Sequence, residues 1–126
     1  MKRFVIGLVT LTFLFFVSLF VASTTKQAYE PIATLLEKAS DTTLHGSFAE
    51  AIEQAEKART LWEKRKSKTA IVADHTPMEE VDLLFTEAEI YAKAEEKPHF
   101  AACCAQLASA IQNMADAHTM NLWNLL

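Results

Sequence analysis

The residues best suited to chemistry lie near the C-terminus, where two histidines and two cysteines fall within residues 99–118. His99 and Cys103 are four residues apart, and a helix places residues at this spacing on one face. Met114 and His118 repeat the spacing. Imidazole and thiolate ligands suit zinc or Cu(I), although a metal site needs three or four converging ligands. One hypothesis is therefore an envelope protein that senses metal or redox state through a cluster of His99, Cys103, Cys104 and His118.

The adjacent cysteines also have a simpler interpretation. On a helix the side chains of Cys103 and Cys104 diverge by about 100 degrees, because one turn holds 3.6 residues. A disulfide between such neighbours would need a strained ring. We therefore expect two small hydrophobic residues on or beside the apolar stripe of a helix. A thiol that faced outward in an oxidising compartment would instead link two chains.

The rest of the sequence lacks the motifs of the common enzyme classes. It contains no serine nucleophile elbow, no glycine-rich phosphate loop and no paired-carboxylate signature. Gly46 is the single glycine after the N-terminal apolar run, so a loop that cradles a phosphate is physically disfavoured. Asp74-His75 is expected in a loop, as turn residues. We predict that the protein is not an enzyme and uses no cofactor and no small-molecule substrate.

Residues 1–23 form a unit of their own at the start of the 126-residue chain. From Phe4 to Ala22 there are 19 residues without a charge, of which 15 are apolar. As a helix they would span about 28 Å, close to the thickness of a hydrocarbon core. Lys2 and Arg3 precede the run, which predicts a cytoplasmic N-terminus and an extracytoplasmic domain over residues 24–126. The alternative is a signal peptide that is cleaved near Ser23, which would release a secreted domain.

The composition of residues 24–126 favours helices. These 103 residues contain 19 alanines but two valines, one glycine and three prolines. The positions of glycine, proline and helix-capping residues predict four helices. They cover residues 26–44, residues 47 to as far as 73, a stretch from 76 and a stretch from 98, and a short tail over 119–126 follows. Capping boxes start the second and third helices at Ser47 and Thr76, and Gly46 is expected to end the first in a left-handed turn.

Each expected helix carries an apolar stripe on one side. The stripes are Tyr29, Ile32, Leu36 and Ala39; Phe48, Ile52, Ala55, Ala58 and Trp62; Met78, Val81, Phe85, Ala88 and Ala92; and Phe100, Cys103, Cys104, Leu107, Ile111 and Met114. Connections of two to four residues force neighbouring helices to run antiparallel. We predict an all-α protein, with an N-terminal transmembrane helix followed by a small antiparallel four-helix bundle made of two helical hairpins.

A basic cluster marks the second half of the second helix, which would return toward the membrane. It consists of Lys57, Arg59, Lys64, Arg65, Lys66 and Lys68. Such a cluster would contact anionic lipid headgroups, at about 1 kcal/mol per residue near the surface. The alternative is a solvated helix end where cations complement the helix dipole. Nucleic acid is disfavoured as a partner, because residues 24–126 carry 10 basic and 16 acidic side chains and are expected outside the cell.

The end of the chain is apolar for its position. Leu122, Trp123, Leu125 and Leu126 would lie near the membrane if the fourth helix also returns toward it. Tryptophan is favoured at membrane interfaces. The tail is therefore expected to reach the interface or to dock a partner, with a cap over the open end of the bundle as the alternative.

The layout as a whole resembles an uncharacterised family of short bacterial proteins, catalogued as domain of unknown function 4363. The resembling features are Met1–Phe4, Ser47-Phe48-x-x-Ala51, Trp62-Glu63, Glu79–Val81 and Asn121–Leu126. The resemblance implies a Gram-positive origin, a single-pass anchor in the cell membrane, an outer helical domain and a partner in the membrane, and it supplies no catalytic residue. We therefore expect an anchored interaction or accessory protein.

Overall fold

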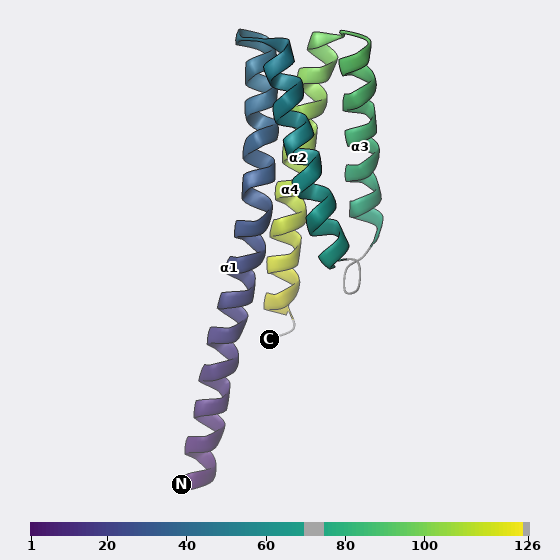
Figure 1. The fold of residues 1–126 in the computed structure, drawn as a ribbon. Helices are drawn as coiled ribbons and strands as arrows, with labels where there is room; N and C mark the ends of the chain where they lie inside the picture. The colour runs from purple at the N-terminus through teal and green to yellow at the C-terminus, as the bar shows by residue number, and fades with distance from the viewer. Residues whose placement is uncertain (70–74, 125–126) are drawn as a thin grey trace.

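The computed structural model describes residues 1–69 and 75–124, with side-chain surroundings for residues 1–20, 27–67 and 77–116. The described chain forms four helices and no strand (Figure 1). They are α1 (Lys2–His45), α2 (Phe48–Thr69), α3 (His75–Lys93) and α4 (Lys97–Asn124). The prediction of an all-α protein with one apolar N-terminal helix is confirmed.

Helix α1 contains both the apolar segment and the first helix of the bundle. It is continuous for 44 residues, with Pro31 inside it. Its first part projects alone beyond the other three helices (Figure 1). By length and composition, Lys2–Phe20 could cross a membrane, and none of this stretch is buried inside the protein. The apolar side chains there therefore have no core to fill.

The four helices do not pack equally against one another. The most extensive contact joins α1 to α4, followed by α1 with α2 and α3 with α4, whereas α2 and α3 meet over far fewer residues. The C-terminal ends of α2 and α4 lie at the end of the bundle from which the apolar segment projects (Figure 1).

The core contains most of the residues that the helical periodicity predicts, together with the buried Ala33, Ala51, Ala101, Ala108 and Ala115. Trp62 is fully buried at its centre, with its ring centroid 6.3 Å from that of Tyr29 and 6.5 Å from that of Phe85. The expected positions Phe48, Ile52 and Ala92 are only partly buried. Of the other expected positions, all are buried: Tyr29, Ile32, Leu36, Ala39, Ala55, Ala58, Trp62, Met78, Val81, Phe85, Ala88, Phe100, Cys103, Cys104, Leu107, Ile111 and Met114.

The turn between α1 and α2 differs from the expected one. Gly46 has φ −145° and ψ −146°, so the prediction of a left-handed turn there is wrong. Its N–H still donates to the carbonyl of Thr42 at 2.8 Å, and a Cβ would lie 3.2 Å from that oxygen. Close approach, rather than a positive φ, therefore favours glycine. The described left-handed residue is Glu95, with φ 56°, between α3 and α4.

The helix ends also correct the sequence-based boundaries. The Ser47 hydroxyl accepts a hydrogen bond from the N–H of Glu50 at 3.4 Å, one half of the expected capping box. His75 begins α3 instead of lying in a loop. Residues 119–124 continue α4, so a separate tail from 119 is wrong there. The physical reason is that neither glycine nor proline follows Pro98 to end the helix.

Candidate functional site

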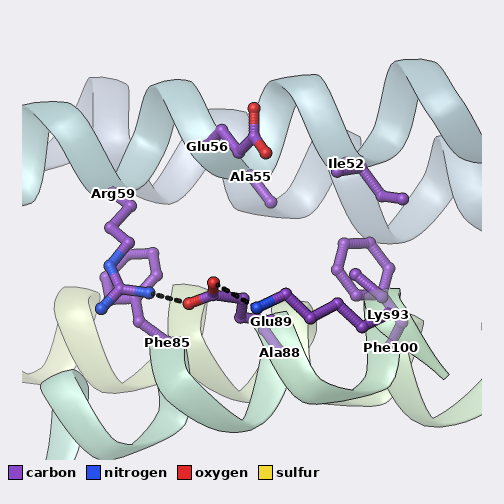
Figure 2. A pocket seen from close by; sticks show the side chains of 10 residues that line it. Ile52, Ala55, Glu56, Arg59, Phe85, Ala88, Glu89, Lys93 and Phe100 are labelled. Atoms are coloured by element: carbon purple, nitrogen blue, oxygen red, sulfur yellow. Dashed lines mark hydrogen bonds and ion pairs between the residues drawn. The ribbon is translucent and has the colours of Figure 1, made fainter.

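The surface between α2 and α3, which we call the seam, is the least closed side of the bundle. Ala55 on α2 and Ala88 and Ala92 on α3 face each other there, and their short side chains leave a cavity of about 300 Å³. Figure 2 shows this cavity with Ile52 above it and Phe100 below. The alanines that keep both helices regular therefore also leave the seam open.

Charged side chains form the rim of this cavity. Arg59 Nη1 on α2 donates to Glu89 Oε2 on α3 at 2.8 Å, and Lys93 Nζ lies 3.1 Å from Glu89 Oε1 (Figure 2). Glu56 extends from α2 on the same rim. Hydrogen bonding to Lys93 and its positive charge, followed by the same interactions with Arg59, lower the pKa of Glu89. The carboxylate of Glu89 therefore stays ionised further into the acid range than that of a free glutamate.

A second polar cluster crosses the seam nearer the end from which the apolar segment projects. The indole N–H of Trp62 donates to Asp82 Oδ1 at 2.8 Å, and Lys66 Nζ donates to Asp82 Oδ2 at 2.5 Å. The hydrogen bond to Asp82 raises the pKa of Lys66. Asp82 thus satisfies a fully buried donor and a partly exposed cation at once. These two clusters hold α2 to α3, where apolar packing is sparse.

In the structure, the side chains of the predicted basic cluster do not share one surface. Arg59 and Lys66 turn into the seam and pair with carboxylates of α3. The Arg65 guanidinium lies over the Tyr29 ring of α1, 5.3 Å from its centroid. Three of the six predicted cations are therefore engaged in packing contacts between helices.

The remaining cations of the cluster lie on another part of α2. Lys57 is exposed and pairs with Glu53 at 3.5 Å, one turn earlier on the same helix. Lys64 is exposed. The side chain of Lys68 lies outside the described residues. Contact with lipid headgroups therefore remains a prediction, and it rests on fewer cations than the sequence suggested.

Both cysteines lie in the core, in agreement with the packing interpretation. They are free, and Cys103 and Cys104 are 3% and 0% exposed. The Cys103 thiol donates to the carbonyl of Leu84 at 3.2 Å. Burial raises the pKa of Cys103 to about 11 and that of Cys104 to about 12. Such thiols are almost fully protonated at neutral pH, so they are poor nucleophiles and poor metal ligands.

The predicted metal ligands have separate partners in the structure. His99 is exposed, stacks on Tyr91 with ring centroids 5.3 Å apart, and places Nδ1 3.4 Å from a carboxylate oxygen of Glu96. The side chain of His118 lies outside the described residues. Within the described part of the chain, no three histidine, cysteine or acidic side chains gather as metal ligands. The metal hypothesis thus gains no geometric support.

The apolar tail is described only in part. The backbone at Leu122 and Trp123 is helical within α4. Their side chains, and Leu125 and Leu126 altogether, lie outside the described residues. Its role at the membrane interface or at a partner remains a prediction.

The seam residues were missed as a site by sequence reasoning. Arg59 and Glu89 are 30 residues apart, and Trp62 and Asp82 are 20 residues apart, on different helices. Helical periodicity relates residues within one helix and does not say which helix lies opposite. One available signal was Asp82 itself, an acidic residue beside the buried Val81.

Comparison with known proteins assigns the chain to a family. The family model described as "Domain of unknown function (DUF4363)" matches residues 19–125, most of the chain. No curated protein and no solved structure matches the chain. The matched range begins within the apolar segment and includes α2, α3 and the described α4. The chain therefore belongs to the DUF4363 family of proteins that contain this domain of unknown function.

Proposed function

We propose that this protein is a membrane-anchored accessory protein whose helical domain lies outside the cytoplasmic membrane and binds another membrane protein. The main support for this proposal is the projecting part of α1, where Phe4, Phe13 and Phe20 are 76%, 66% and 74% exposed. Contiguous apolar surface of this kind is unfavourable in water and favourable in a bilayer. Lys2 and Arg3 before it support a cytoplasmic N-terminus.

The continuity of α1 supports a fixed position for the domain above the membrane. No break in the helix separates the apolar segment from the bundle, which we propose is antiparallel and made of two helical hairpins. A rigid connection would hold each surface of the bundle at a constant height over the bilayer. Such a scaffold suits lateral contact with a neighbouring membrane protein. The competing proposal is cleavage near Ser23 and release of the domain.

Contact of the lower bundle with lipid headgroups is part of the same proposal. Arg65 lies over Tyr29, so this part of α2 is level with a point on α1 seven residues beyond Ala22. Seven helical residues extend about 10 Å. The exposed Lys64 would therefore lie within about one Debye length of the headgroups.

Crosslinking in intact cells tests the topology and the partner together. Every described helix carries an exposed lysine that a membrane-impermeant, amine-reactive crosslinker can reach: Lys38 on α1, Lys57 and Lys64 on α2, Lys93 on α3, and Lys97 on α4. We expect a reproducible adduct with one integral membrane protein. A chain that reacts only after the cells are broken would contradict the topology. Reaction without an adduct to any other membrane protein would contradict the accessory role.

The mass of the mature chain separates an anchor from a signal peptide. We expect the full-length mass in the membrane fraction, both for the natural chain and for a control with Ser23→Leu. Leucine removes the small residue that a signal peptidase requires directly before a cut after Ser23. A natural chain that is shortened and found in the medium, with the control retained at full length, would show cleavage and refute the anchor.

A further inference from the structure

The outer face of α3 is apolar at its centre and acidic at its sides. Leu83 and Ile90 are 62% and 58% exposed. They are seven residues apart, two helical turns, so they lie on the same face. Glu79 and Glu87, which flank them on this face, are also exposed. We call Glu79, Leu83, Glu87 and Ile90 the acidic face.

The outer surface of α2 carries the opposite charge around an apolar residue. Lys57, Leu61 and Lys64 follow each other at spacings of four and three residues, so they share one face. Both lysines are exposed, and Leu61 is 38% exposed. Lys57 pairs with the exposed Glu53 one turn earlier at 3.5 Å, so Lys64 contributes most of the uncompensated positive charge. We call these three residues the basic face. It is distinct from the seam, which receives Arg59 and Lys66 from another side of the helix.

We propose that neighbouring copies of the chain associate side by side in the membrane, with the acidic face of one against the basic face of the next. The two faces are complementary in charge, and each places a leucine or isoleucine where the other can cover it. Complementary potentials favour this pairing over acidic-to-acidic or basic-to-basic contact. The proposal rests on the anchoring under the proposed function, because the anchor sets the relative height of the copies.

The contacts across the seam show which residues of α2 and α3 lie at the same level along the bundle axis. Arg59 faces Glu89 and Lys66 faces Asp82, so seven residues forward along α2 correspond to seven residues back along α3. This register places Leu61 level with Glu87. In copies that are anchored in the same direction, each residue lies at the same distance from the membrane. Residues that are level within one copy are therefore also level between neighbouring copies.

At these levels the two faces interlock. Leu61 of one copy meets the acidic face midway between Leu83 and Ile90, where a single apolar side chain can insert. Lys57 and Lys64 lie one turn above and below Leu61, so both are offset from Glu87 by about 6 Å or less along the helix axis. Two flexible lysines can span this offset and pair with one carboxylate. Each copy also offers both faces, so the contact is head-to-tail and extends into a row or closes into a ring.

Cysteine crosslinking of the full chain in its native membrane tests this contact. We expect Leu61→Cys with Glu87→Cys in one chain to give a ladder of dimers and higher oligomers under a mild oxidant. Either single variant should stay monomeric, because a head-to-tail contact does not bring identical residues together. The natural Cys103 and Cys104 are buried and should not contribute. The matched control is Leu61→Cys with Ala105→Cys, an exposed position on α4, which should give no ladder.

Charge exchange provides a second test that does not depend on oxidation. With two differently tagged copies, Lys64→Glu in both or Glu87→Lys in both should reduce co-purification several-fold. Mixing a Lys64→Glu copy with a Glu87→Lys copy should restore it, because the new glutamate then faces the new lysine. Misfolding would not be rescued in this way, so restoration identifies an interface.

The outcomes separate this proposal from the proposed function. A full-length chain that is in the membrane fraction, gives no ladder and shows no effect of the charge exchanges on co-purification would overturn the association and leave the anchor standing. A chain found in the soluble fraction would overturn the anchor and the shared register with it. Crosslinking by either single variant would indicate a symmetric contact and overturn the head-to-tail arrangement. An adduct of another mass at position 87 would show that a different protein covers the acidic face, and would also overturn it.

Discussion

Replacement of Asp82 by alanine is the most informative single change, because Asp82 joins α2 to α3 where little apolar packing does so. In the natural chain its carboxylate accepts from the indole N–H of Trp62 at 2.8 Å and from Lys66. Trp62 is fully buried, so its N–H would lose its acceptor, and only water entering at the partly exposed position 82 could replace it. An unsatisfied buried donor destabilises a protein by about 1–3 kcal/mol.

The ion pair adds a smaller contribution. The side chains of Lys66 and Asp82 are 37% and 32% exposed, and pairs this open to solvent contribute about 0.2–1 kcal/mol. We therefore expect Asp82→Ala to lower the free energy of unfolding by about 1–4 kcal/mol. Asp82→Asn keeps an oxygen acceptor for Trp62 and should cost about 1 kcal/mol or less.

The assay is urea unfolding of the full chain in mild detergent, followed by circular dichroism at helical wavelengths. A double-mutant cycle with Trp62→Phe isolates the buried hydrogen bond, because phenylalanine has no donor to leave unsatisfied. In that background Asp82→Ala should cost only the ion-pair contribution. The reasoning is refuted if Asp82→Ala matches the natural chain within about 0.5 kcal/mol, a change too small for an orphaned donor. It is also refuted if alanine is equally harmful in the Trp62→Phe background.

Three further predictions concern the thiols, the seam and the core. Cys103 and Cys104, with pKa values raised to about 11 and 12, should not react with a thiol reagent at pH 8 until the chain unfolds, and fast labelling of the native chain would contradict their burial. The lowered pKa of Glu89 makes its carboxylate stabilising above the unfolded-state value of 4.5. That contribution is lost as pH falls through the folded-state pKa, so natural and Glu89→Gln chains should differ in melting temperature at pH 7 and converge in acid. Phe100 is 1% exposed, so Phe100→Ala should destabilise the bundle by about 3–5 kcal/mol. Phe16 lies in the exposed apolar segment, so Phe16→Ala should leave the unfolding midpoint of the bundle unchanged.

The sequence was most reliable where a signal repeats along one helix. The buried positions Leu36, Trp62, Phe85 and Ile111 all follow from apolar spacing, because the turn of 3.6 residues is a local property of the chain. The apolar run before Lys26 was equally clear from composition. Boundaries were less secure: α4 runs on to Asn124 because an apolar tail without glycine or proline has no reason to leave the helix.

Contacts between helices could not be read in the same way. Six cations close together in the sequence looked like one surface, yet Arg59 and Lys66 turn toward α3 and Arg65 turns toward α1. A helix rotates by about 100 degrees per residue, so adjacent cations face different directions. Which of them meets a carboxylate depends on the helix that lies opposite.

The sequence by itself therefore determined the composition of the parts: an apolar N-terminal segment, helices with apolar stripes, and an acidic domain after the segment. Only the tertiary structure decided that the segment and the first bundle helix are one continuous α1, and that α2 and α3 leave an alanine-lined seam closed by Asp82 and Glu89. The physical reason is that hydrophobic periodicity is encoded within each helix, whereas the pairing of charges across a seam depends on how separate helices are placed in space.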